Sequence, residues 1–274
     1  MMALFKNIRT VLIIFLGIVN FFILMVFGSD MQSVRAKIVF LDVGQGDATL
    51  ILAENDDQVL IDGGDGKRIM DELGKNMPFY DHTIELVVIT HPDSDHAGGL
   101  IEVLKYYEVD EILQTRYSCD TQICKELDAV ISEKGIKRRY AQFGQMIHAG
   151  DQSAEILHFG DAGTGASDDN NDSIVLKASI NGKTILLMGD AGSLVESDLI
   201  RRGIDIDSDI LKVSHHGSKS ATSAEFIEKV SPQKAIISVG KNKYGHPSDD
   251  VLNRLKNVNI EVLRTDISGD VAVE

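Results

Sequence analysis

A short polar segment that directly follows an apolar stretch places the strongest constraint on what this chain can fold into. Residues 86–89 are apolar and predict a buried strand, and the segment 90–96 after it holds two histidines and two aspartates. Each of these side chains would need a partner if it were buried in a core. Strand ends are where rigid scaffolds present functional groups, and imidazole with carboxylate suits Zn, Mn and similar ions. The sequence therefore indicates a metal site at this strand end.

The same residue types recur after three later apolar stretches. They are Asp190 after 185–188, His215 and His216 after 211–213, and His246 after 236–239. This recurrence disfavours the simpler interpretation of the first cluster as a polar strand-to-helix turn. Strands that end at one edge of a sandwich bring distant side chains into one cleft, so we expect the four clusters to meet. Asp190 has two carboxylate oxygens and could bridge two ions.

From Ala36 onward, short strands alternate with helical stretches in two series. The first series predicts strands at 37–41, 48–52, 58–61, 86–89, 112–113, 139–140 and 153–157, with helices at 67–73 and 98–107. The second predicts strands at 174–180, 183–188, 210–213, 235–239, 260–263 and 271–273, with helices ending near 202, 230 and 255. Two such series indicate two sheets packed face to face and covered outside by helices. Since no Pro-, Gly- or Ser-rich linker separates them, we expect 36–274 to be one domain.

The first 35 residues differ from everything after them. Lys6 and Arg9 precede an apolar run over 11–27, a pattern typical of a signal peptide or a signal anchor. A spanning helix needs about 20 apolar residues and a signal-peptide core about 7–15, so both readings stay open. We expect residues 1–35 to form one hydrophobic helix of either kind. The domain would then be extracytoplasmic, anchored to the membrane by this helix, or secreted if the helix is cleaved.

The remainder of the chain is strongly acidic. Residues 30–274 hold 25 Lys and Arg against 42 Asp and Glu, a net charge of −17. This charge repels a phosphate backbone and argues against a broad nucleic-acid surface. It does not exclude a nuclease whose metal ions supply positive charge locally. Cys119 and Cys124 are the only cysteines, and in an oxidising compartment they favour a small disulfide loop over two free thiols.

Seven short motifs, read together, resemble a known family. They are 40–48 (FLDVGQGDA), 60–64 (LIDGG), 91–99 (HPDSDHAGG), 170–173 (NNDS), 187–191 (LMGDA), 214–218 (SHHGS) and 244–248 (YGHPS). In this order they resemble the metallo-β-lactamase superfamily, specifically the hydrolase domain of ComEC-type competence proteins. The resemblance implies an α+β fold, the αββα sandwich, with a metal site at one edge of the two sheets. ComEC proteins also carry a many-helix membrane channel, whereas this sequence offers one hydrophobic segment at most.

The resemblance implies one or two divalent metal ions, Zn or Mn. Asp93 stands where the wider superfamily has histidine, and Asn170 or Asn171 stands where another histidine falls; ComEC-like proteins share both changes. Harder oxygen ligands weaken the first site and favour Mn²⁺ or mixed occupancy. The second site is complete, with His216 preferred over His215. The predicted metal ligands are His91, Asp93, Asp95, His96, Asp190 and His216.

The leading functional hypothesis is phosphodiester hydrolysis, with nucleic acid among the possible substrates, through a metal-bound hydroxide. The predicted catalytic residues are Asp95, His215 and His246, and either histidine could protonate the leaving oxygen or hold a phosphate oxygen. One alternative is a small-ester hydrolase acting on a phosphocholine ester or a lactone at the same site. The other is a non-catalytic, metal-stabilised surface module. A β-lactamase is disfavoured, and no protein partner is deducible.

Several other polar residues have weaker signals. Asp42, Gln45 and Asp47 lie in a Gly-rich turn that is equally compatible with lining the site and with a plain turn. Asp62 is expected to orient a metal ligand or the turn after its strand and not to bind metal directly. The histidines outside the motifs are interpreted as surface or hydrogen-bonded side chains; they are His82, His148 and His158.

Overall fold

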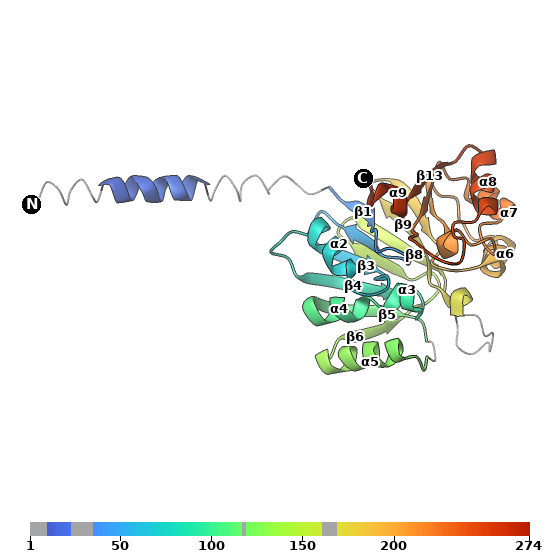
Figure 1. Cartoon of the computed structure of the whole chain (residues 1–274), viewed down its shortest axis with the longest axis horizontal. Coiled ribbons are helices and arrows are strands. Elements are labelled where there is room, and N and C mark those ends of the chain that lie inside the picture. The colour runs from blue at the N-terminus through green and yellow to red at the C-terminus, as the bar shows by residue number, and fades with distance from the viewer. Residues whose placement is uncertain (1–9, 23–34, 117–118, 161–168) are drawn as a thin grey trace, which may run out of the picture. The chain divides into compact units, whose positions relative to one another are not determined.

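The computed structural model describes residues 10–22, 35–116, 119–160 and 169–274 (Figure 1). The chain divides into two compact units, Met1–Arg35 and Ala36–Glu274. In the first unit, residues 10–22 form a helix with exposed apolar side chains such as Val11 and Phe15. Over the described part of the chain, no helix is both long enough and apolar enough to cross a membrane.

Two seven-stranded sheets form the centre of the second unit. The first has the order β14-β1-β2-β3-β4-β5-β6, and the second has the order β13-β12-β11-β10-β9-β8-β7. The strands of the first sheet are β1 (Lys37–Phe40), β2 (Thr49–Leu52), β3 (Gln58–Ile61), β4 (Thr83–Ile89), β5 (Glu108–Gln114), β6 (Lys137–Tyr140) and β14 (Val271–Val273). Those of the second are β7 (Met146–Ala149), β8 (Gln152–His158), β9 (Val175–Ile180), β10 (Lys183–Leu187), β11 (Ile210–Lys212), β12 (Lys234–Ile237) and β13 (Glu261–Arg264).

Helices cover the outer face of each sheet. Figure 1 shows α2, α4 and α5 against the first sheet, while α6, α7 and α8 lie with the second. The helices are α2 (Arg68–Asn76), α3 (Ser94–Ala97), α4 (Leu100–Tyr106), α5 (Gln122–Lys134), α6 (Ser193–Arg201), α7 (Ala224–Val230), α8 (Asp249–Asn257) and α9 (Thr265–Ser268). Two 3-10 turns, η1 (Asp169–Asp172) and η2 (Ser214–Gly217), complete the elements.

The inner strands of the two sheets are largely buried on both faces, which explains why most of their residues are apolar. In β1, Ile38 and Phe40 join the core between the two sheets, whereas Val39 joins the core under the outer helices. Successive side chains of a strand point to opposite faces, so a strand covered on both sides needs apolar residues at every position. The resulting four layers are those of the predicted αββα sandwich, and the prediction of two packed sheets is confirmed.

Several elements differ from the sequence-based expectations. The helix expected to begin at Gly98 is preceded by the separate helical turn α3, which carries Asp95 and His96. The strand β7 and the helix α5 were not predicted. The final strand, β14, was predicted as a strand, but it pairs antiparallel with β1 in the first sheet and not with its sequence neighbour β13.

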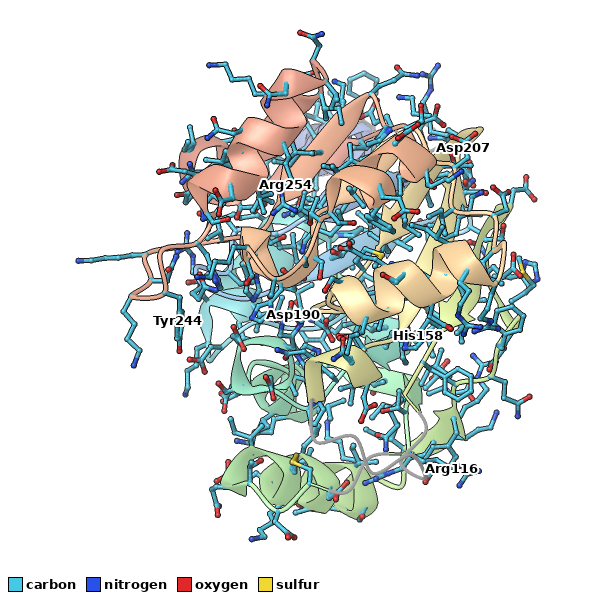
Figure 2. All side chains as sticks on the ribbon, turned by 90° about the vertical axis from the view of Figure 1, so that its right-hand side faces the viewer. Arg116, His158, Asp190, Asp207, Tyr244 and Arg254 are labelled. Carbon is cyan, nitrogen blue, oxygen red and sulfur yellow. A yellow bond between two sulfur atoms is a disulfide. The ribbon has the colours of Figure 1, made fainter. Side chains whose placement is uncertain are left out.

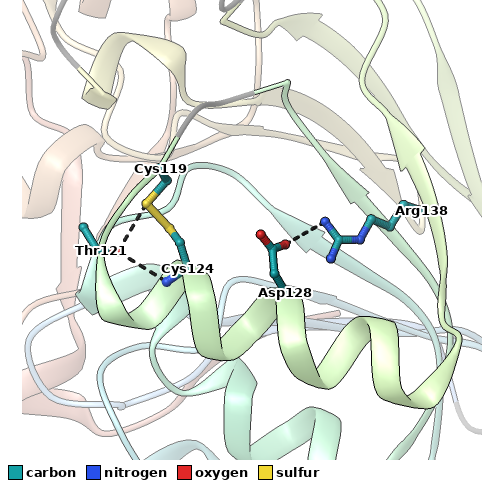
Figure 3. The surroundings of a disulfide bond; sticks show 5 residues. All are labelled: Cys119, Thr121, Cys124, Asp128 and Arg138. Carbon is teal, nitrogen blue, oxygen red and sulfur yellow. Dashed lines mark hydrogen bonds and ion pairs between the residues drawn. A yellow bond between two sulfur atoms is a disulfide. The ribbon is translucent and has the colours of Figure 1, made fainter.

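A disulfide bond joins Cys119 and Cys124 at the start of α5 (Figure 3). Between them, the Thr121 hydroxyl caps the helix by accepting a hydrogen bond from the Cys124 amide at 3.3 Å. Farther along α5, Asp128 forms an ion pair with Arg138 of β6 at 2.7 Å. The expected disulfide loop is therefore present, and it holds the N-terminus of a helix that packs on the first sheet.

Candidate metal centre

The four polar clusters come together at one edge of the two sheets. β3 and β4 run parallel, as do β10, β11 and β12, so their carboxyl ends share that edge. His91 follows β4 and Asp95 and His96 lie on α3, while the second sheet contributes Asp190 after β10, His215 and His216 on η2, and His246 after β12. Asp190 is labelled in Figure 2, where it lies within the body of the domain.

Asp190 is the centre of the cluster. Its Oδ1 is 3.2 Å from His96 Nε2, and its Oδ2 is 3.6 Å from His216 Nε2, 3.7 Å from His215 Nε2 and 4.0 Å from His91 Nε2. The carboxylate therefore faces imidazoles from both halves of the chain. This is the arrangement expected for an aspartate that touches two ions.

Several ligand atoms in the cluster are buried and unpartnered. His91 Nε2, His96 Nε2, His216 Nε2 and Asp190 Oδ1 have no hydrogen-bond partner among the described residues. Buried polar atoms normally have one, so each such atom requires an explanation. Here the atoms converge on each other, and imidazole with carboxylate is a donor set suited to Zn or Mn. The residues therefore fit a divalent metal centre.

Three groups of side chains bring their ligand atoms within 4.8 Å of one another. They are His91–His96–Asp190, Asp95–His96–His216 and Asp47–Asp190–His216. His96, Asp190 and His216 each belong to two of the groups, so neighbouring ions would share ligands. The three groups contain five of the six predicted ligands together with Asp47, which the sequence left equally open to a structural role.

Asp93 lies at the mouth of the cluster and outside these three groups. Its Oδ2 is 3.7 Å from His91 Nε2, and its side chain is 44% exposed. Asp95 is less exposed, with its Oδ2 3.2 Å from His216 Nε2. Both carboxylates therefore lie on the more exposed, open side of the centre.

Each of the three inner imidazoles is held by the protein through Nδ1. His96 Nδ1 is 2.8 Å from Asp62 Oδ2, His216 Nδ1 is 3.0 Å from the Ser238 carbonyl oxygen, and His91 Nδ1 is 3.1 Å from the Thr90 hydroxyl. Such contacts select one tautomer and orient the ring. As a result, all three rings turn Nε2 toward the cluster.

Asp62 lies behind His96, as expected for a residue that orients a metal ligand. Its carboxylate accepts hydrogen bonds from the Thr90 amide at 2.9 Å and the Thr90 hydroxyl at 2.6 Å, in addition to contacting His96. The side chain is buried. Asp62 thus links the ends of β3 and β4 and fixes the His96 ring.

Lys212 and Asp47 form a buried ion pair beside the centre that sequence reasoning missed. Lys212 Nζ donates to Asp47 Oδ2 at 2.6 Å and to the Val213 carbonyl at 3.1 Å, and both side chains are almost fully buried. Asp47 Oδ1 lies 3.3 Å from His216 Nδ1. A lysine inside the apolar strand at 210–213 was the available signal, because a buried lysine requires a charged partner.

The backbone at the two adjacent histidines has an uncommon conformation. His215 has φ 49° and His216 has φ 52°, both in the left-handed region. Non-glycine residues rarely adopt this region, at a cost of the order of 1–3 kcal/mol each, and such residues concentrate at functional sites. The turn aims the two rings in different directions, at an interplanar angle of 83°, so His216 faces the buried centre while His215 stays partly exposed.

Charges within the cluster shift the pKa values of its histidines in opposite directions. Burial, with His96 nearby, lowers the pKa of His91 to about 4. Burial also disfavours charge on the other two rings, but Asp190 and Asp62 raise the pKa of His96 well above its usual value, and Asp190 and Asp47 raise that of His216 to about 10. The carboxylates thus stabilise positive charge in the centre, which a divalent ion would supply in place of protons.

A small cleft opens beside the centre. It has a volume of about 180 Å³ and is lined by Asn170, Asn171, Asp190, Gly192, Ser193, Leu194, His215 and Ser220. Asn171 Oδ1 accepts a hydrogen bond from the Gly192 amide at 3.2 Å, so this side chain supports the wall of the cleft. The backbone oxygen of Asn171 is 2.9 Å from His158 Nε2, which agrees with the interpretation of His158 as a hydrogen-bonded side chain.

His246 lies beside His215. Its ring is half-buried, with its centroid 5.4 Å from that of His215, and its Nδ1 has no partner within the described residues. Burial and the nearby His215 and His216 lower the pKa of His246. Thus His215 and His246, the two histidines predicted to act on the substrate, lie side by side next to the predicted ligands.

Residues 41–241 match the sequence model of the Metallo-beta-lactamase superfamily. The chain belongs to this superfamily. The fold agrees with that of the metallo-beta-lactamase fold protein YhfI from Bacillus subtilis, with a TM-score of 0.59, 11% identity and coverage of 87% of this chain and 100% of that one. Membership supports the prediction of a metal-dependent hydrolase.

Two curated relatives support the ComEC-type resemblance. ComE operon protein 3 of Bacillus subtilis is 30% identical over 289 residues, which cover 99% of this chain and 37% of that protein. Recombination protein 2 of Haemophilus influenzae is 34% identical over 242 residues, which cover 85% of this chain and 28% of that protein. This chain therefore spans well under half the length of either relative.

Proposed function

We propose that this protein is a metal-dependent phosphodiesterase whose substrates include nucleic acid. The observation that carries the proposal is the set of unpartnered buried ligand atoms around Asp190, contributed by both halves of the chain. The similarity to Recombination protein 2 supports nucleic acid as the substrate. His215 and His246, whose rings lie side by side, would supply the groups that a phosphodiester requires beside the metal.

In this proposal the predicted residues divide into inner and outer roles. His91, His96, Asp190 and His216 would hold metal, with Asp95 on the open side and Asp93 at the mouth. A bound divalent ion supplies Lewis acidity, polarising a phosphoryl oxygen and lowering the pKa of a water molecule. His215 lines the cleft and His246 lies beside His215, so one would hold a phosphate oxygen and the other would deliver a proton to the leaving oxygen.

A turnover assay tests the proposal. The full-length chain, purified in detergent and stripped of metal, is assayed with bis-p-nitrophenyl phosphate and single-stranded DNA, with and without added Mn²⁺ or Zn²⁺. We expect metal-dependent hydrolysis of both substrates, which Asp190→Ala abolishes. The matched control is Asp205→Ala, because Asp205 is 81% exposed and pairs with Lys177 on the surface. Stoichiometric metal binding without hydrolysis of either substrate would refute the proposal.

A small ester is the second candidate substrate. The strongly acidic chain and the cleft of about 180 Å³ suit a small molecule better than a duplex. In the same assay, a phosphocholine ester or a lactone would then be hydrolysed while DNA is not. If Asp190→Ala unfolds the protein and no substrate is ever hydrolysed, the metal is structural and the domain is a surface module.

We also propose that residues 1–35 carry the domain out of the cytoplasm and anchor it to the membrane, or release it after cleavage. The support is the basic flank at Lys6 and Arg9 and the helix over 10–22, whose apolar side chains are exposed. Protease added to intact cells should digest a C-terminally tagged chain, whereas a version lacking residues 2–29 should be protected. Equal protection of both proteins would refute this localisation.

A further inference from the structure

We propose that the loop from Gly240 to His246, here called the Tyr244 loop, binds an unpaired nucleotide next to the phosphate that is hydrolysed. Tyr244 would stack on the base, and Lys241 and Lys243 would contact flanking phosphates. The proposal rests on the phosphodiesterase function and names residues that determine its substrate class. A binding measurement that needs no turnover tests it independently.

The Tyr244 loop is rigidly built although it is largely exposed. The Asn242 amide nitrogen donates to the carbonyls of Gly240 at 2.9 Å and His246 at 2.8 Å, and its Oδ1 accepts from the amides of Tyr244 at 3.0 Å and His246 at 3.1 Å. One side chain therefore makes four hydrogen bonds across the loop. Such preorganisation reduces the entropy lost when a ligand binds.

The loop presents an aromatic ring that the fold does not use. Tyr244 is 65% exposed, and Figure 2 shows it on a loop that projects from the body of the domain. Among the described residues, its ring neighbours are polar or charged: His246 at 5.8 Å and Lys243, whose Nζ lies 5.7 Å from the ring centroid. A ring held away from the core contributes little to stability, but it offers a free face to a ligand.

A series of neighbouring rings connects Tyr244 to the metal centre. The centroid of Tyr244 lies 5.8 Å from that of His246, which lies 5.4 Å from that of His215, and His215 Nε2 is 3.7 Å from Asp190 Oδ2. The Tyr244 and His246 rings are inclined by only 31°. A base stacked on Tyr244 would therefore belong to the nucleotide at the metal centre or to an adjoining one.

The charge of this segment is opposite to that of the chain. Residues 229–248 include Lys229, Lys234, Lys241 and Lys243 but no Asp or Glu, although the whole chain has a net charge of −15. Lys241 and Lys243 are exposed, and neither forms an ion pair with an acidic residue in the described ranges. Two uncompensated lysines beside an exposed ring match the combination by which proteins hold single strands.

These features favour an unpaired nucleotide over a phosphocholine ester and over a base-paired nucleotide. An aromatic ring could also hold the quaternary ammonium of a phosphocholine ester, but two adjacent lysines would repel that cation. A base-paired nucleotide could not stack on the side chain because its faces are covered by neighbouring pairs. Stacking and backbone charge together identify a single strand.

The first test uses the absence of tryptophan from the chain. Tyr244→Trp then carries a single tryptophan, whose fluorescence reports a stacked base. A thymidine oligonucleotide titrated into the metal-free full-length protein should quench that fluorescence, and an oligonucleotide of abasic sites should not. The matched control is Tyr106→Trp on α4, because Tyr106 is 67% exposed against 65% for Tyr244. Equal quenching of both variants, or none in either, would overturn the proposal.

The second test separates stacking from chemistry. Tyr244→Ala should raise KM for single-stranded DNA by roughly 5- to 150-fold, the range for one base–aromatic stack, with a smaller effect on kcat. Tyr244→Phe should restore KM, because it keeps the ring. A fall in kcat with unchanged KM would overturn the assignment of Tyr244 to binding. If the wild type lacks turnover but the fluorescence result holds, the phosphodiesterase proposal fails and the nucleotide site stands.

The lysines are tested by salt dependence. A plot of log affinity against log salt concentration has a negative slope. In the double variant Lys241→Gln/Lys243→Gln, the magnitude of this slope should decrease by about 1.4, since each phosphate contact in a single strand contributes about 0.7. Lys229→Gln serves as the control, because Lys229 is an exposed lysine on α7, outside the Tyr244 loop. A slope unchanged in the double variant would overturn the role of these lysines.

Discussion

At the residue scale, Asp62 orients His96 and offers a specific test of the centre. Asp62→Asn should keep the fold but lower metal affinity about 10- to 100-fold, because the amide holds the ring more weakly than a carboxylate does. Asparagine is the suitable replacement, since Asp62 has φ 58° and asparagine tolerates that region. Isothermal titration with Mn²⁺ or Zn²⁺ measures the change.

The control for this prediction is Asp56→Asn. Asp56 also has a positive φ, 66°, but it lies in an exposed turn after β2. Its replacement should leave metal affinity unchanged. If both variants bind metal as tightly as the wild type, the contact between Asp62 and His96 does not tune the centre.

The buried pair of Lys212 and Asp47 gives a second prediction. Lys212→Met should lower the free energy of unfolding by about 3–5 kcal/mol, because it removes the lysine that pairs with the buried Asp47 carboxylate. Lys234→Met on the adjacent strand should cost less than about 1 kcal/mol, since Lys234 is 45% exposed and pairs with Glu261 at the surface. Urea unfolding of the metal-free proteins measures both, and equal losses would contradict the importance of burial.

This effect should also depend on pH with a defined sign. Burial would raise the pKa of Asp47, but Lys212 and His216 outweigh it and hold the pKa below its usual range. A carboxylate with a depressed pKa contributes stability above its unfolded pKa of about 3.9 and loses it as the pH falls. The difference between the wild type and Lys212→Met should therefore shrink as the pH is lowered below about 4.

Sequence patterns predicted the residues of the centre that follow apolar strands, but not the ion pair beside them. His91, Asp190 and His216 each stand out locally. Lys212 and Asp47, by contrast, are 165 residues apart, and neither position reveals the other. Lys212 lies two residues after Ile210 in β11, so its side chain points to the same face, toward the core between the two sheets. Which face of β11 meets the other sheet is known only from the three-dimensional structure.

At the scale of elements, the helix α5 depends on a local covalent link. Replacing both cysteines, Cys119→Ser/Cys124→Ser, should lower the free energy of unfolding by about 2 kcal/mol, because the bond closes a loop of sequence separation 5. Metal affinity should be unchanged, since α5 contributes none of the candidate ligands. Reductant should destabilise the wild type but not the double variant. Equal sensitivity of the two proteins to reductant would contradict this account.

The elements missed from sequence share a physical cause. Most side chains of α5 are partly or fully exposed, and its apolar stripe is weak, because only Cys124, Leu127 and Ile131 are buried in this helix. β7 is an edge strand with alternate residues exposed, including Met146. In both, the apolar pattern is too short to stand out. The inner strands are mostly apolar because helices cover their outer faces, and all of them were predicted.

At the scale of the whole molecule, β14 joins the first sheet as an edge strand beside β1. β14 pairs with β1 through the register Ile38–Val273 and Phe40–Val271, although more than 200 residues separate these partners. Periodicity predicted that β14 is a strand, but the choice of sheet depends on long-range packing that a local pattern does not contain. The fold class came instead from the order of motifs along the chain, which is a property of the whole molecule.

The metal centre should also join the two halves of the domain. His91 and His96 come after a strand of the first sheet, whereas Asp190 and His216 come after strands of the second. A metal that binds only the folded protein at 100 times its Kd adds about 2.7 kcal/mol to the free energy of unfolding. For a domain of this size, that corresponds to a Tm increase of roughly 5–11 °C. Calorimetry of the metal-free protein with added Mn²⁺ or Zn²⁺ should show this increase, Asp190→Ala should lose it, and Asp205→Ala should retain it. A Tm that does not respond to metal in the wild type would contradict a centre shared between the sheets.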